Sequence, residues 1–129
     1  MLNNDTMHPL ITLAASVAVP KINNDPRNFW LGAVGVRTDG VIVSAKNGAC
    51  KESLAQGSGW SFPQCHAEFR CVKKMDRGGI VYVARVARDG SLAMAKPCRD
   101  CETLLRNKGI RRAYYSIGPT EYGVMVLNN

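Results

Sequence analysis

The sequence lacks an apolar segment long enough to cross a lipid bilayer. Its longest apolar stretch runs from Leu10 to Val19, about half the length that a transmembrane helix requires. No Lys or Arg precedes this stretch, so the pattern also argues against a secretory signal peptide. We therefore expect a soluble, cytoplasmic protein that does not associate with a membrane.

Acidic residues are scarce relative to basic ones. The chain has 10 Asp and Glu against 17 Lys and Arg, which gives a formal net charge of +7. Such an excess favours anionic partners such as nucleotides, nucleic acid or an acidic surface. The five cysteines are an odd number, so they cannot all pair in disulfides. Without a secretory signal, metal binding or catalysis is the better expectation for them.

The chain also lacks repeats, low-complexity segments and any stretch that looks like a linker. With 129 residues, of which 46% are hydrophobic, it falls in the range of one folded domain and outside the composition of disordered proteins. We expect residues 1–129 to form a single domain.

Hydrophobic periodicity and turn residues predict an alternation of helices and strands. The helices are expected to begin at 6–9 and end before Pro20, to run from 61–63 to 78–79, and to run from Pro97 to Gly109. The strands are expected at 30–36, 41–45, 80–87, 112–117 and 124–127, with a short extended piece at 92–95.

The link between the last two strands sets their direction. Only Gly118 to Gly123 joins them, which is too short for the crossover that parallel strands need. The predicted fold is therefore α/β, with a mixed five-stranded sheet sandwiched by helices and the last two strands antiparallel.

Two short motifs carry residues suited to metal chemistry: Cys-His-Ala-Glu at 65–68 and Pro-Cys-Arg-Asp-Cys at 97–101. His66, Cys98 and Cys101 offer one imidazole and two thiolates, which is a common zinc ligand set. Three protein ligands leave a position for water, and Glu68 is the obvious partner of that water.

Helical spacing supports this interpretation. Glu68 shares one helix face with Cys71, Val72 and Met75, so a carboxyl group lies at the N-terminal end of an otherwise apolar stripe. The thiols at 98 and 101 fall in the first turn of a predicted helix, where free N–H groups and the helix dipole stabilise thiolates.

These motifs resemble those of the cytidine and deoxycytidylate deaminase superfamily, and the order of elements also resembles its fold. The resemblance implies zinc-dependent hydrolysis of a cyclic amidine C–N bond in a cytosine-bearing nucleoside or nucleotide, for example dCMP to dUMP plus ammonia. It implies that His66, Cys98 and Cys101 hold Zn²⁺, whose bound hydroxide attacks the ring carbon. Glu68 would shuttle the proton to the ring nitrogen and to the departing ammonia.

The resemblance also suggests residues that bind the substrate. Asn47 is expected to contact the sugar, although Asn23, Asn24 and Asn28 are alternatives, and backbone N–H groups near Ala67 and Cys98 would orient the base. Tyr115 and Trp30 are candidates for stacking on the base, as are Phe29, Tyr114 and the loop residue Trp60. Core packing is the competing explanation for the aromatic residues in strands.

The family match is mixed in one respect. Small cytidine deaminases resemble this chain in their antiparallel last strands, but they normally have Cys where this chain has His66. Deoxycytidylate, tRNA-editing and polynucleotide deaminases have His there, but usually place a helix before a parallel last strand. The resemblance therefore does not select a substrate within the superfamily.

Several alternatives stay open. A polynucleotide deaminase is supported by the net charge and by a basic cluster at Arg106, Lys108, Arg111 and Arg112, whereas the compact chain favours a small substrate. An inactive deaminase-fold binding module is disfavoured by Glu68, and a structural Cys₄ site at 65, 71, 98 and 101 by the spacing of its first two thiols. We expect Cys50, Cys65 and Cys71 to be buried thiols and His8 to be a helix-start residue. Relatives in the family are often oligomers, so a homo-oligomer is also compatible with the resemblance.

Overall fold

The computed structural model describes residues 7–18, 29–46, 48–49, 64–65 and 67–128. Predictions for the loop 21–28 and most of the segment 47–64 lie outside these residues. The described helices are α1 (Pro9–Ala18), α3 (Ala67–Val72) and α4 (Arg99–Lys108). The described strands are β1 (Phe29–Val36), β2 (Ile42–Lys46), β3 (Gly48–Ala49), β4 (Gln64–Cys65), β5 (Ile80–Ala87), β6 (Leu92–Ala93), β7 (Arg112–Ser116) and β8 (Tyr122–Val126).

The main sheet has the strand order β2-β1-β5-β7-β8. Strand β5 runs antiparallel to β1 and parallel to β7, and β8 returns antiparallel to β7. The predicted mixed sheet and the antiparallel last pair are therefore confirmed. The prediction of five strands is corrected to six, because the turn Arg88–Gly90 brings β6 back to pair with β5.

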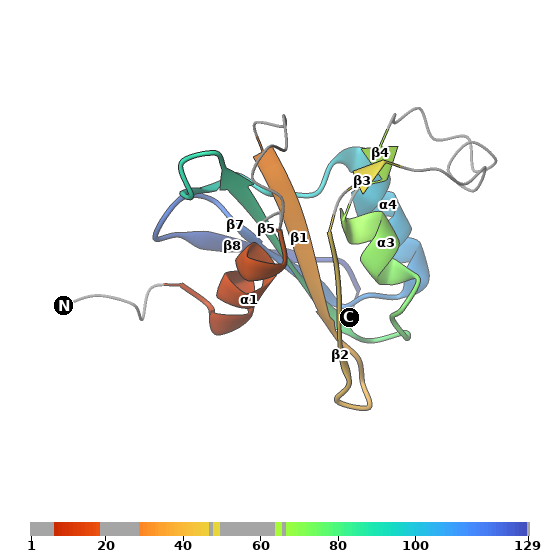
Figure 1. Cartoon of the computed structure of the whole chain (residues 1–129). Coiled ribbons are helices and arrows are strands. Elements are labelled where there is room, and N and C mark those ends of the chain that lie inside the picture. The colour runs from red at the N-terminus through yellow and green to blue at the C-terminus, as the bar shows by residue number, and fades with distance from the viewer. Residues whose placement is uncertain (1–6, 19–28, 47, 50–63, 66, 129) are drawn as a thin grey trace.

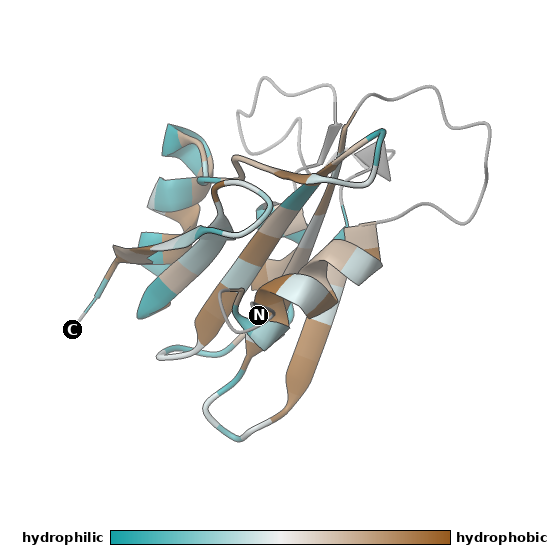
Figure 2. Ribbon diagram, turned by 90° about the vertical axis from the view of Figure 1, so that its left-hand side faces the viewer, coloured by the Kyte–Doolittle hydropathy of each residue, from teal (hydrophilic) through white to brown (hydrophobic). Residues whose placement is uncertain are grey.

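Helices cover both faces of the sheet, as predicted. Figure 1 shows α1 on one face and α3 with α4 on the other. The alternation of β1 explains this arrangement, because Val34 packs with Ile11 and Ala14 of α1 while Ala33 packs with Cys71 of α3. In Figure 2 hydrophobic residues run along the strands, whereas the turns between them are mostly hydrophilic.

The second helix differs most from its prediction. It was expected to extend from 61–63 to 78–79, but α3 covers only Ala67–Val72. At its start, Gln64 and Cys65 instead pair with Ala49 and Gly48 in a two-residue antiparallel ladder. At its end, single turns replace the helix, with Met75 N–H donating to the Val72 carbonyl at 3.1 Å.

The third helix is close to its prediction. It covers Arg99–Lys108, and Gly109 follows it with a φ of 90°, the left-handed conformation that glycine adopts without strain. Within the described residues, no helix is long and apolar enough to span a membrane.

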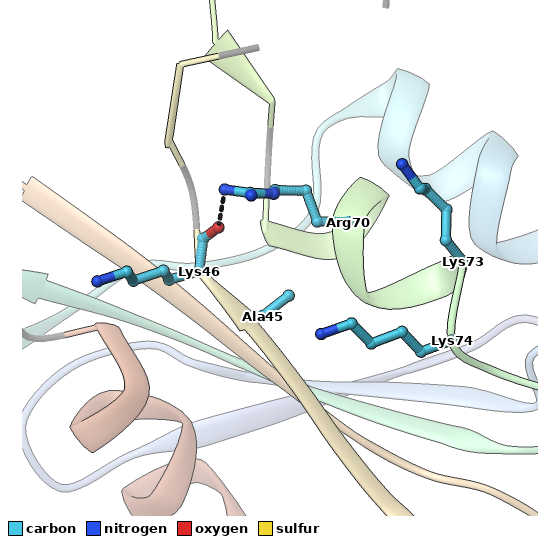
Figure 3. Close-up of a pocket in the computed structure, with 5 residues that line it drawn as sticks. All are labelled: Ala45, Lys46, Arg70, Lys73 and Lys74. Carbon is cyan, nitrogen blue, oxygen red and sulfur yellow. Dashed lines mark hydrogen bonds between the residues drawn. The ribbon is translucent and has the colours of Figure 1, made fainter. Parts of the chain in front are cut away.

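Two basic side chains, one from α3 and one from the turn that follows it, donate hydrogen bonds to the edge strand β2. The Arg70 guanidinium donates to the Lys46 carbonyl at 3.0 Å, and Lys74 Nζ donates to the Ser44 carbonyl at 2.6 Å. Figure 3 shows both side chains reaching across a pocket that Ala45 and Lys73 also line. These bonds engage backbone groups of an edge strand, which would otherwise be open to pairing with another chain.

The contact between α1 and β1 depends on Gly32. A Cβ atom there would collide with the Ala14 carbonyl oxygen and lie 2.8 Å from the Ala18 backbone nitrogen. We predict that Gly32→Ala lowers the free energy of unfolding by about 1–3 kcal/mol, because α1 must move off the sheet. Urea denaturation measures the effect.

The matched control is Gly118→Ala, since a Cβ at Gly118 meets no heavy atom within 4 Å. That substitution should change stability by less than about 0.5 kcal/mol. Equal stabilities of the two variants would contradict this close packing of α1 on β1.

Candidate active site

The candidate site lies where the starts of α3 and α4 meet one end of the sheet. A pocket of about 230 Å³ opens there, and both Glu68 and Cys98 line it. The remaining lining residues are Leu31, Arg85, Met94, Ala95 and Lys96. Residues from both predicted motifs thus come together although they are about thirty positions apart in the chain.

Glu68 is the buried polar group of this pocket. Its side chain is only 3% exposed, and Oε1 has no hydrogen-bond partner among the described residues. Burial raises the pKa of this carboxyl from 4.5 to about 7, because a low-dielectric surrounding disfavours the charged form. A carboxyl group with a pKa near neutrality can both take up and release a proton.

The two motif cysteines flank the start of α4. Cys98 is the residue before the helix, with extended backbone angles, and is exposed, while Cys101 is fully buried in the first turn. Burial raises the pKa of the Cys101 thiol, and the neighbouring Glu68 and Cys98 raise it further. The two thiols and the carboxyl group are thus close enough for their charges to interact.

This donor set fits a zinc ion. A divalent cation stabilises thiolate and carboxylate groups in their charged forms, which burial otherwise disfavours at Glu68 and Cys101. The third predicted ligand, His66, lies outside the described residues, and within the part of the chain that is described no three His, Cys, Asp or Glu residues form a complete metal site.

The buried hydroxyl group of Ser116 forms hydrogen bonds with backbone groups beside the pocket. Ser116, at the end of β7, is fully buried; its Oγ accepts the Arg85 N–H at 3.2 Å and donates to the Ala93 carbonyl at 2.7 Å. Its own carbonyl accepts the Ala95 N–H at 2.9 Å. Ser116 therefore fixes the segment that leads from β6 to Cys98 against the end of β5.

The predicted substrate-binding residues are only partly brought to this pocket. Ala67 is fully buried beside Glu68 as the first residue of α3, and Asn47 lies outside the described residues. Trp30 packs with Ala18 and Val86 on the α1 face, away from the pocket. Tyr115 lies on the α3–α4 face and packs against the core there, without lining the pocket.

Other aromatic residues form a cluster on the α1 face. Tyr82 and Tyr114 stack with ring centroids 5.0 Å apart, and the His8 ring lies 4.7 Å from that of Tyr82. His8 Nδ1 also accepts the Leu10 N–H at 3.1 Å, which confirms His8 as a helix-start residue. Core packing thus accounts for Tyr114.

Cys71 follows its prediction, whereas one member of the basic cluster is engaged within the fold. Cys71 is a buried thiol, and burial raises its pKa to about 12; Cys50 and the Cys65 side chain lie outside the described residues. Within the basic cluster, Arg106 pairs with Glu102 at 2.8 Å and donates to the Leu127 carbonyl at 2.7 Å, so that side chain has a structural role.

Arg85 and Lys96 line the pocket but were not singled out from the sequence. The alternation of β5 offers a signal for the first, because Val81 and Val83 face the helices and Arg85 occupies the next position on that face. A charged residue at an inward position of a buried strand is unusual. Lys96 carries no comparable signal.

Comparison with known proteins identifies the family. The cytidine and deoxycytidylate deaminase zinc-binding region matches residues 6–117. The chain belongs to this deaminase family. The match spans both motifs, Glu68 and the pocket-lining segment at 93–98.

Solved structures of similar fold agree with this assignment. Cytidine deaminase from Burkholderia pseudomallei is 15% identical, with a TM-score of 0.61 over 98% of this chain and 94% of that chain. The enzyme from Mycobacterium tuberculosis is 20% identical, with a TM-score of 0.55 over 88% and 85%. The enzyme from Mycobacterium leprae is 19% identical, with a TM-score of 0.54 over 96% and 94%. A search of curated proteins found no significant match.

The raised pKa of Glu68 predicts a pH dependence of stability for the protein freed of metal with a chelator. Between pH 4.5 and about 7 the unfolded chain loses this proton while the folded chain keeps it. The folded state then binds more protons, so stability falls as pH rises through this window and levels off above it. Glu68→Gln should lack this part of the decline.

Chemical denaturation of the metal-free protein at a series of pH values measures the difference. The control is Glu102→Gln, which removes a solvent-accessible carboxyl group on α4. Parallel stability curves for the wild type and Glu68→Gln would show that the Glu68 carboxyl group is not held protonated by burial.

Proposed function

We propose that this protein is a zinc-dependent hydrolytic deaminase of a cytosine-bearing nucleoside or nucleotide, such as dCMP. The observation that carries the proposal is the buried Glu68 carboxyl group, whose Oε1 is unpaired among the described residues, in a pocket shared with Cys98. Such an arrangement is costly for stability, and it suits a group that exchanges protons with a bound reactant.

His66, Cys98 and Cys101 would hold the zinc ion. When bound, zinc supplies the Lewis acidity that makes water a nucleophile at neutral pH. The position of Cys98 and Cys101 at the start of α4 supports their thiolate forms, because free N–H groups and the helix dipole favour negative charge there.

Glu68 would move the proton. Its carboxylate takes a proton from the attacking water and delivers it to the ring nitrogen beside the amino-bearing carbon. Glu68 would then carry the second proton, from the new hydroxyl group, to the amino group. The carbon–nitrogen bond breaks, ammonia leaves, and the ring keeps the oxygen as a carbonyl. A carboxyl pKa near 7 suits both steps, because neither protonation state is strongly favoured at neutral pH.

The rest of the pocket would hold the base and exclude water. Leu31, Met94 and Ala95 supply apolar surface around Glu68, which strengthens electrostatic interactions inside the pocket. Backbone N–H groups near Ala67 and Cys98 would orient polar edges of a ring. The structural neighbours named above are cytidine deaminases, which supports cytosine as the base.

We predict that Glu68→Gln lowers kcat for deamination by about 10²–10⁴-fold, because the proton transfer loses its carrier. The assay follows ammonia release from dCMP, cytidine and a cytosine-containing single-stranded oligonucleotide, measured side by side on zinc-loaded protein. Zinc content should remain at the wild-type level, since Glu68 is not proposed as a ligand.

Glu102→Gln is the control, because it removes a carboxyl group from α4 outside the pocket and should retain activity. Wild-type turnover by Glu68→Gln would refute the proton-transfer role. No ammonia from any of the three substrates, with zinc bound, would favour a binding module instead. Turnover confined to the oligonucleotide would identify a polynucleotide deaminase.

A further inference from the structure

Two cations line the pocket that holds Glu68. Arg85 lies near the end of β5, where it pairs with Leu31 of β1 and Ala93 of β6, and Lys96 lies in the segment that leads to Cys98. The conversion of cytosine to uracil does not itself require a positively charged side chain beside the base. The half-buried Arg85 therefore needs a separate explanation, and the exposed Lys96 adds a second positive charge to the same pocket.

The Arg85 side chain contacts an aromatic ring and has no counter-ion within the part of the chain that the structure describes. Its guanidinium carbon lies 4.2 Å from the centroid of the Phe29 ring, and its Nε is buried without a hydrogen-bond partner among the described residues. Neither Arg85 nor Lys96 forms an ion pair with any residue that the structure describes. A partly desolvated cation with unused donors is costly unless an anion joins it.

Ser116 binds the backbone of Arg85 and of the residue before Lys96. Ser116 Oγ accepts the backbone N–H of Arg85, and the Ser116 carbonyl accepts that of Ala95, the residue before Lys96. The spacing between the two positions is thus set by the sheet rather than by a free loop. Such preorganised donors are typical of a binding site.

Glu68 does not fill the role of counter-ion. Its Oε1 is itself unpaired among the described residues, and no ion pair joins it to Arg85 among those residues. Among the described residues no carboxylate pairs with Arg85 or Lys96, so an anionic group of the ligand can take that place. Since the ligand class proposed above is a cytosine nucleoside or nucleotide, its one strong anionic group is a phosphate.

We propose that Arg85 and Lys96 bind a phosphate ester of the substrate, so that the enzyme acts on cytosine nucleotides in preference to the free nucleoside. This inference rests on the function proposed above. The forked guanidinium of arginine can bind two phosphate oxygens at once, and the lysine adds a point charge. The net charge of +7 favours the approach of such an anion. The phosphate can belong to a free monophosphate or to a polynucleotide backbone.

The test compares the wild type with Arg85→Gln, Arg85→Lys and Lys96→Gln, all loaded with zinc. The readout is the ratio of kcat/KM for dCMP to that for deoxycytidine, with a short single-stranded oligodeoxynucleotide containing one cytosine as a third substrate. Loss of a charged hydrogen bond should lower the nucleotide preference by about 10- to 100-fold in Arg85→Gln. Arg85→Lys should recover part of it, and Lys96→Gln should lose less.

Arg88→Gln is the matched control. Arg88 also lies over an aromatic ring, with its guanidinium carbon 5.7 Å from the centroid of the Trp30 ring, but it does not line the pocket. The preference of Arg88→Gln for dCMP over deoxycytidine should equal that of the wild type. A preference shared by dCMP and the oligonucleotide supports phosphate recognition generally, and a preference for one of them identifies the source of the phosphate.

A wild-type enzyme that uses dCMP and deoxycytidine equally well, or an Arg85→Gln variant with an unchanged ratio, would overturn the proposal. Calorimetric binding of dUMP and deoxyuridine keeps the test separate from turnover. If no substrate releases ammonia, the proposed function fails. Phosphate recognition then stands if dUMP binds at least tenfold more tightly than deoxyuridine in the wild type but not in Arg85→Gln, and falls otherwise.

Discussion

The burial of the Glu68 carboxyl group is the constraint around which the rest of this site is arranged. A carboxyl group with an unpaired oxygen in an apolar surrounding destabilises a fold unless it stays protonated or meets a positive charge. The structure keeps Glu68 at 3% exposure and places two thiols beside it. Burial disfavours the charged form of Glu68, and burial together with Glu68 and Cys98 disfavours that of Cys101, so a cation is suited to this site.

The sheet supplies the rigidity that such a site needs. Strands β5 and β7 are parallel and start beside each other, with α4 in the crossover between them. Ser116 at the end of β7 joins β5, β6 and the segment before Cys98 through three hydrogen bonds. A buried hydroxyl group with all its partners in place specifies one arrangement of these elements. The position of the cysteines relative to Glu68 therefore depends on strand packing, not on a flexible loop.

The sequence predicts the elements of this fold better than it predicts their contacts. Strong periodicity and clear turn residues gave β5, α4 with Gly109, and the antiparallel pair β7–β8 nearly as the structure has them. The helix around Glu68 was predicted too long at both ends, because the pairing of Gln64–Cys65 with Gly48–Ala49 is a non-local contact that no local pattern reveals.

The site was predictable to the extent that its residues lie in short motifs. Glu68, Cys98 and Cys101 come from such motifs and are adjacent in space. Trp30 shows the limit of that reasoning. Alternation separates the two faces of a strand but does not say which face carries the pocket, and the Trp30 ring lies on the α1 face, away from it. Arg85 was missed for the converse reason, since its place in the pocket depends on three strands and on the segment before α4.

We propose that Glu68 shares its pocket with a zinc ion held by two cysteines and one histidine. X-ray absorption spectroscopy at the zinc K-edge of the zinc-loaded protein measures this ligand set. We predict one bound zinc ion with two sulfur ligands at about 2.3 Å and nitrogen or oxygen ligands at about 2.0–2.1 Å, and one fewer sulfur ligand in Cys98→Ser. Four sulfur ligands, or failure of the wild-type protein to bind zinc, would contradict it.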